Sequence, residues 1–136
     1  LLLGEILERF FQKKPDDISV SIDRSDPWLM VHINVNNRRR ARIQCVIESD
    51  TDILIGDIVH DYEIADFNRG YGTLMMEHLL VFARENHFHY IHGNLSTVDL
   101  DHKERLHHFY QKFGFVVTEY PEVHGNNYGI IEMSLD

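Results

Sequence analysis

The segment from Ile53 to Leu95 constrains the fold more than any other part of the sequence. It begins with a continuously apolar run, Ile53 to His60, which is typical of a central strand covered on both sides. Thr73 to Asn86 then has apolar residues at helical spacing, and His89 to Leu95 reads as a second short strand. A strand, a helix and a strand in this order predict a crossover, with the two strands parallel and the connection right-handed.

Alternating apolar and polar residues before this unit predict an antiparallel meander. The expected elements are a helix over Leu1–Lys14 and strands over Ile18–Ile22, Leu29–Val35 and Ala41–Glu48. Asn36 and Asn37 predict a tight turn between the last two of these strands, because asparagine tolerates positive φ.

A second helix and two final strands follow the crossover unit. Asp101 and Glu104 have the spacing of a capping box, and Gly114 suits the left-handed position at a helix C-terminus. The stretches FVVTEY and YGIIEMSL then predict two strands joined by a turn. We therefore expect one α/β domain over residues 1–136, with a mixed, mostly antiparallel sheet, one parallel crossover and helices on both faces.

The charge balance limits the classes of partner. The chain carries 22 acidic and 13 basic residues, a formal net charge of -9. We therefore expect no nucleic-acid and no membrane partner, and we interpret Arg38 to Arg42 as a solvated hairpin flank. A nucleic-acid-associated module that uses these arginines is the alternative.

Two further features bear on the compartment. The single cysteine, Cys45, alternates with apolar residues and is expected in the core, so no intrachain disulfide can form. No apolar stretch approaches the roughly 20 residues of a membrane span, and the N-terminus lacks a basic leader. These features predict a cytoplasmic protein.

The glycine pair Gly70 and Gly72 stands between the apolar strand and the helix. The first turn of a helix has unpaired N–H groups and a partial positive charge, and glycines let an anion approach the backbone closely. Arg69 would add a full charge. The pattern is neither a P-loop nor a dinucleotide fingerprint, because Met75 occupies the place of the third glycine. A tight turn before a helix is the alternative interpretation.

The stretch HHFYQKFGF, from His107 to Phe115, adds a second motif. Together the two stretches resemble the GNAT superfamily of acyl-CoA-dependent N-acyltransferases. Its first motif, Q/R-x-x-G-x-G/A, opens a helix after a central strand. Its second motif is a helix that ends in an aromatic-Tyr-x-Lys-x-Gly-Phe pattern. The resemblance covers roughly Ile53 to Val117, and its motifs are about forty residues apart.

The resemblance implies a binding site for acetyl-CoA as co-substrate. By analogy with the family, the pyrophosphate would be held by Asn68, Arg69, Gly70, Tyr71, Gly72 and Thr73. The backbone of Asp61 and Tyr62 would hydrogen-bond the pantetheine arm, and Lys103 stands where family members often have a cofactor-contacting Asn.

The resemblance also implies direct attack of an amine on the thioester. Tyr110 matches the family tyrosine that gives a proton to the departing thiolate, although it could also be a core residue. Ile58 stands where some members carry a catalytic glutamate. His60 lies two residues further on the same face, and the ordinary pKa of an imidazole, about 6.5, suits a base. A water chain that ends on Asp57, Asp61 or Glu63 is the alternative to His60.

Several departures from the family pattern keep a second function open. Phe67, Lys103 and Leu106 differ from the usual family residues, and the strand glutamate is missing. A catalytically silent acyl-CoA-binding or regulatory module is therefore the alternative to an N-acetyltransferase. The acceptor would be an amine, either a small molecule or a peptide, and the protein a monomer or homodimer. No metal is expected, because the histidines do not converge with carboxylates or cysteines at zinc spacing.

Overall fold

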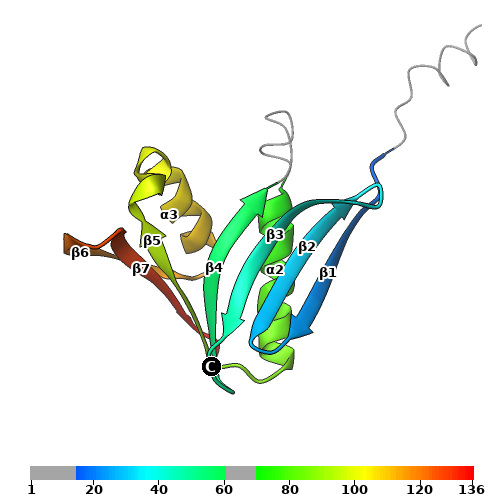
Figure 1. The fold of residues 1–136 in the computed structure, drawn as a ribbon, viewed down its shortest axis with the longest axis horizontal. Coiled ribbons are helices and arrows are strands. Elements are labelled where there is room, and N and C mark those ends of the chain that lie inside the picture. The colour runs from blue at the N-terminus through cyan, green and yellow to red at the C-terminus, as the bar shows by residue number, and fades with distance from the viewer. Residues whose placement is uncertain (1–14, 61–69) are drawn as a thin grey trace, which may run out of the picture.

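The computed structural model describes residues 15–136 apart from 61–69, and the side chain of His60 is also outside the description (Figure 1). The helix expected at Leu1–Lys14 therefore lies outside the described residues. No helix in the described ranges combines the length and the apolar character needed to cross a membrane.

A seven-stranded sheet in the order β1-β2-β3-β4-β5-β7-β6 forms the body of the structure. The strands are β1 Ile18–Ser25, β2 Trp28–Val35, β3 Arg38–Ile47, β4 Asp52–His60, β5 Tyr90–Ser96, β6 Val116–His124 and β7 Asn127–Ser134. All neighbours are antiparallel except β4 and β5. The mixed sheet with one parallel crossover is therefore confirmed.

The parallel pair β4 and β5 separates along its length. The two strands pair only where Asp52 to Ile55 lie beside Tyr90 to Gly93. Beyond this point β4 continues against β3 and β5 continues against β7, so the strands diverge toward their carboxyl ends (Figure 1). The divergence leaves the facing backbone edges of the two strands without a partner strand in the described part of the sheet.

Helix α2, Tyr71–Glu85, covers one face of strands β1 to β3. Its buried residues include Met75, Met76, Leu79 and Leu80, which pack on the apolar face formed by alternate strand residues. Cys45 belongs to this core with 1% of its surface exposed, and burial raises the pKa of its thiol to about 12. The prediction of a small core residue at Cys45 is confirmed.

Helix α3, Lys103–Lys112, follows the 3₁₀ helix η2, Thr97–His102. The capping box expected at Asp101 and Glu104 is wrong, because Asp101 lies inside η2 and α3 begins after His102 without a side-chain cap. The cap instead comes earlier, where the Val98 amide donates to Ser96 Oγ at 3.4 Å. An additional turn of helix thus precedes the one that the pattern predicted.

Three residues with positive φ confirm the expected turns. Asn36 and Asn37 adopt φ of 52° and 63° between β2 and β3, and Gly114 adopts φ of 100° after α3. Strand β3 begins at Arg38, three residues before the expected start, so the arginine run belongs to the sheet.

Candidate active site

The N-terminus of α2 provides a turn with accessible backbone. Gly70 caps the helix in the left-handed region with φ of 79°, and the Leu74 amide donates to its carbonyl at 3.0 Å. The amides of Gly72 and Thr73 therefore lie in the first turn, where N–H groups have no acceptor within the helix. The first turn contains no acidic side chain, so nothing in it opposes an anion.

The glycine turn packs directly against α3. A Cβ atom at Gly72 would lie 3.4 Å from Phe109 Cε2. The Lys112 ammonium donates to Thr73 Oγ1 at 2.6 Å and lies 5.2 Å from the centre of the Phe109 ring. The two sequence motifs, separated along the chain, therefore form one continuous site.

Tyr110 has a buried ring and an accessible hydroxyl. The residue is 7% exposed, and its ring makes edge contacts with Phe109 and Phe115 at centroid distances of 5.4 and 5.6 Å. Among the described residues none hydrogen-bonds its hydroxyl, and none has a fully buried polar side-chain atom without a partner. The hydroxyl therefore reaches solvent.

The surroundings of Tyr110 keep its phenol protonated. Burial raises the pKa of this phenol above its ordinary value, and the negative charges of Asp99 and Asp57 add to the effect. Asp57 lies on β4 just beyond the paired segment, and Asp99 lies in η2 just after β5. Tyr110 thus carries a transferable proton near the point where β4 and β5 diverge.

The comparisons with known proteins agree with this geometry. Residues 66–115 match the model of the Acetyltransferase (GNAT) family, and this range contains both the glycine turn and the α3 motif. The fold is that of the GNAT acetyltransferases. The resemblance identified in the sequence is confirmed.

The solved structures share the GNAT architecture at low sequence identity. A GNAT family acetyltransferase from Elizabethkingia anophelis with acetyl-CoA bound has a TM-score of 0.65 at 14% identity, covering 88% of this chain and 99% of its own. Ard1 from Thermoplasma volcanium has a TM-score of 0.61 at 19% identity, covering 77% and 69%. At these identities the likeness concerns the fold.

A curated relative of greater identity matches part of the chain. The uncharacterized protein YocC of Bacillus subtilis strain 168 is 35% identical over 68 residues. This match covers 50% of the present chain, which spans 38% of the relative.

Several site residues expected from the GNAT resemblance are not placed by the structure. Asp61, Tyr62, Asn68 and Arg69 lie outside the described residues. His60 ends β4 with its backbone paired to Ala41, and its side chain is not described. Their roles stay predictions.

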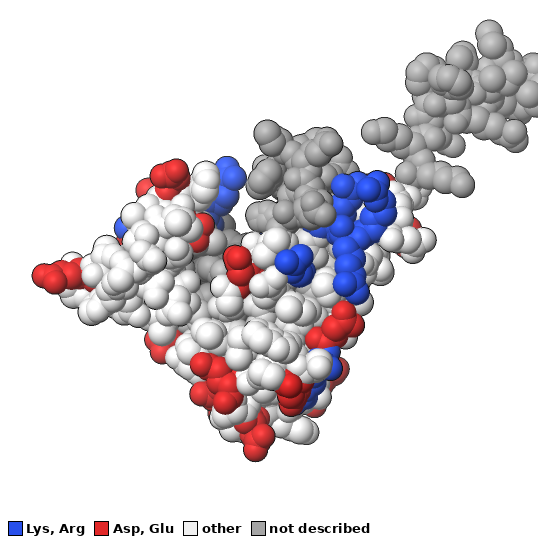
Figure 2. Space-filling view, in the orientation of Figure 1, with Lys and Arg blue, Asp and Glu red and all other residues white. Residues whose placement is uncertain are grey.

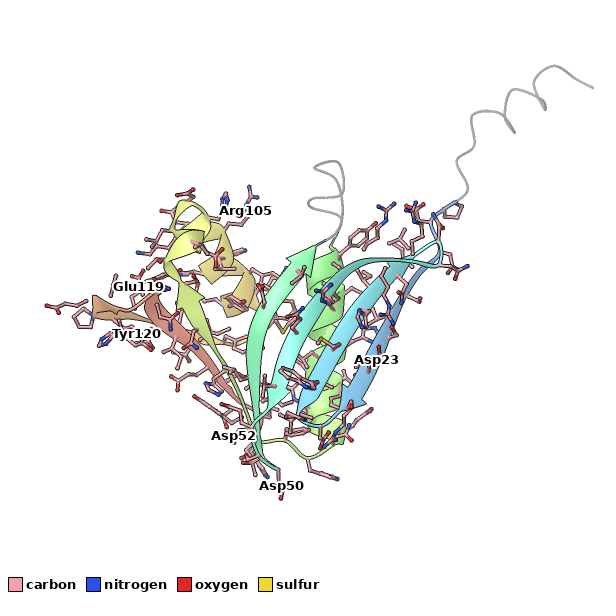
Figure 3. All side chains as sticks on the ribbon, in the orientation of Figure 1. Asp23, Asp50, Asp52, Arg105, Glu119 and Tyr120 are labelled. Carbon is pink, nitrogen blue, oxygen red and sulfur yellow. The ribbon has the colours of Figure 1, made fainter. Side chains whose placement is uncertain are left out.

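Two other expected binding residues have partners within the protein. Lys103 forms an ion pair with Glu119 of β6, labelled in Figure 3, and its ammonium lies 5.8 Å from the centre of the Tyr128 ring. Tyr71 is 4% exposed, so its side chain belongs to the core. Its expected contact with phosphate would therefore be made by the backbone, and the roles of both residues stay predictions.

The structure adds a polar pair that the sequence interpretation missed. His107 Nε2 and the Tyr128 hydroxyl form a hydrogen bond of 2.9 Å, with the rings stacked at 5.9 Å. His107 precedes Tyr110 by nearly one helical turn and stands in the quoted motif, so its position was visible, but its partner on β7 was not. No group of three or more metal-ligating side chains occurs in the described ranges.

Proposed function

We propose that the chain transfers an acetyl group from acetyl-CoA to an amine by direct attack, as an N-acetyltransferase. The observation that carries the proposal is the contact between the glycine turn of α2 and the Tyr110 helix at the divergence of β4 and β5. This arrangement combines an anion-binding backbone, an exposed strand edge and a protonated phenol within one site.

The residues present fit the binding of acetyl-CoA. The left-handed Gly70 has no heavy atom of the described residues within 4 Å of the place where a Cβ would lie, so a phosphate could approach the first-turn amides of α2. Thr73 and Gly72 complete the described part of this cradle, and Asn68 and Arg69 are its expected continuation. The backbone of Asp61 and Tyr62 would hold the pantetheine arm. When bound, acetyl-CoA supplies the thioester that serves as acyl donor.

Tyr110 is proposed as the proton donor. The amine nitrogen forms a bond with the thioester carbonyl carbon, the carbon–sulfur bond breaks, and the phenol gives its proton to the departing thiolate. A phenol carries its proton at neutral pH even at its ordinary pKa of about 10, and the raised pKa of Tyr110 leaves it protonated.

The amine must also lose a proton, because an alkylammonium has a pKa of about 10. His60, at the end of β4, is the proposed base, and a water that leads to Asp57 is the alternative. Each of the two residues would be replaced by one that does not titrate, and the pH dependence of turnover measured. The replacement that changes this pH dependence identifies the base.

A catalytically silent acyl-CoA-binding module is the second candidate function, favoured by the ion pair that occupies Lys103. The purified chain would be incubated with acetyl-CoA and a panel of amines, and free CoA thiol measured over time. Turnover supports the enzyme. Binding of CoA by calorimetry without any turnover supports the silent module.

A further inference from the structure

A cationic groove lies on the face of strands β1 to β4 opposite α2. Its volume is about 400 Å³, and its lining residues are Asp23, Met30, His32, Arg39, Arg40, Ala41, Arg42 and Val59. Strand register explains this gathering, because His32 pairs with Arg42 and Arg42 pairs with Val59 across β2, β3 and β4. Directly paired residues of neighbouring strands point to the same face.

Figure 2 shows the basic side chains as a patch on the face turned to the viewer, beside the residues drawn in grey. The same face carries Asp23 on β1, labelled in Figure 3. The cluster stands out because the whole chain has a net charge of -9. A local excess of positive charge on an acidic protein focuses a field that attracts small anions.

The positive charges of this groove are only partly neutralised. Arg39 Nη2 lies 3.5 Å from Asp23 Oδ2, and His32 Nε2 lies 3.2 Å from the same oxygen. Arg42 faces a neutral group, because exchange of the Gln44 amide oxygen and nitrogen, which satisfies both side chains, lets that oxygen accept from Nε and Nη2 at 2.7 and 2.8 Å. Arg40 has no carboxylate partner within the described ranges. Among the described residues that line the groove, one carboxylate therefore accompanies three guanidinium groups.

His32 makes the groove a built site rather than a loose surface cluster. Its side chain is 8% exposed and fixed between the sheet and Asp23. Burial lowers the pKa of the imidazole, and the positive charges of Arg39 and Arg42 lower it further while Asp23 opposes them. A guanidinium pair on a rigid strand beside this imidazole suits bidentate recognition of a carboxylate or phosphate.

The groove and the candidate active site are connected through strand β4. Val59 lies two residues after Asp57 on β4, and Asp57 is one of the charges that act on Tyr110. The β2–β3 hairpin that begins the arginine run lies at the same end of the sheet as the N-terminus of α2 (Figure 1). A ligand anchored at Arg40 and Arg42 could therefore extend along β4 toward the divergence of β4 and β5.

We propose that this groove holds the anionic end of the acceptor, so that the substrate is a small amine carrying a carboxylate or phosphate group. The inference rests on the proposed N-acetyltransferase function and narrows its acceptor class. Arg40 and Arg42 bind the anion, and the amine lies at the other end of the molecule. A carboxylate and a phosphate both present negatively charged oxygens to the arginines, and the assay below distinguishes between them.

The test compares three acceptors of similar length: 5-aminopentanoate, 4-aminobutylphosphonate and pentylamine. Acetylation is followed with wild type, Arg40→Gln, Arg42→Gln and the control Arg84→Gln. Arg84 is an exposed arginine in the last turn of α2, at the other end of that helix from its glycine turn.

We expect kcat/KM for at least one anionic amine to exceed that for pentylamine about tenfold or more in wild type. Arg40→Gln and Arg42→Gln should remove this preference by raising KM, with kcat, CoA affinity and pentylamine turnover unchanged. Whichever of the two anionic amines shows the preference identifies the anion. Arg84→Gln should behave like wild type.

Equal use of the three amines, or an unchanged preference in both groove variants, would overturn the inference while leaving the acetyltransferase intact. If no amine is acetylated, the proposed function fails. Calorimetric binding of the two anionic amines then tests separately whether the groove binds the anion. Binding that is lost in Arg42→Gln supports it, and no binding overturns it. Salt-sensitive binding of RNA or DNA through the same arginines would also overturn it.

Discussion

Replacement of Tyr110 by phenylalanine separates catalysis from folding in this structure. The substitution removes one hydroxyl and leaves the ring in its contacts with Phe109 and Phe115. Because no described residue hydrogen-bonds that hydroxyl, the free energy of unfolding should change by less than about 0.5 kcal/mol. Loss of a general acid lowers turnover by about 10²–10⁴, which corresponds to about 3–5 kcal/mol in the activation barrier.

The assay measures release of free CoA thiol with a chromogenic disulfide under native conditions. The protein's own thiol should not interfere, because Cys45 is 1% exposed and burial raises its pKa to about 12. Thermal melts and calorimetric CoA binding on the same preparations supply the stability and affinity. Tyr110→Phe should lower kcat with little change in either.

Tyr128→Phe is the matched control. It also removes a buried-ring hydroxyl, but one that hydrogen-bonds His107, so it should cost about 1 kcal/mol of stability. A Tyr110→Phe protein with a rate within threefold of wild type would mean that Tyr110 only packs. A loss of stability as large as that of Tyr128→Phe would refute the statement that its hydroxyl has no protein partner.

The remaining predictions concern the glycine turn, the sheet and the groove. Gly70→Val should weaken CoA binding at least tenfold and lower the free energy of unfolding by about 1–2 kcal/mol, because Gly70 is left-handed. Gly70→Asn should also lower CoA affinity, with a smaller loss of stability. Equal CoA affinity in wild type and both variants would count against phosphate binding at the glycine turn. Gly129→Ala should destabilise the fold by about 1–3 kcal/mol or more in urea titrations, since its Cβ would lie 2.4 Å from the Thr118 carbonyl oxygen. The lowered pKa of His32 means that the unfolded state binds more protons below about pH 6.5, so stability should fall between pH 7.5 and 5.5, and less steeply in His32→Gln. An identical pH slope in both proteins would contradict this cause.

Local patterns predicted the elements well because they depend on short-range chemistry. The alternation of β2 and β3 and the asparagine turn between them followed from side-chain period and from the positive φ that asparagine accepts. The start of α3 did not follow, because Ser96 with Asp99 offers a helix start earlier than the one offered by Asp101 with Glu104. The choice between them depends on Ser96, which caps the earlier turn.

The candidate site was predicted only where its residues share a motif. Tyr110 and the glycine pair follow from the GNAT resemblance, whereas the hydrogen bond between His107 and Tyr128 joins residues from two elements that no local pattern relates. The interpretation of Arg38 to Arg42 as a solvated flank was incomplete for a similar reason. Pairing with β2 and β4 brings Arg42 beside His32 and Val59, and cross-strand register is a property of the folded sheet.

The two glycines of the turn have different physical roles, and this difference bears on the function. A Cβ at Gly72 would meet the Phe109 ring at ordinary contact distance, so α2 approaches α3 closely at this point. Gly70 has no atom of the described residues near its missing Cβ, and it caps the first turn of α2 with a left-handed φ. The contact with Phe109 gives Gly72 a neighbour within the protein, whereas the space beside Gly70 has no described occupant. A phosphate that approaches the first-turn amides would use both the conformation and the space at Gly70.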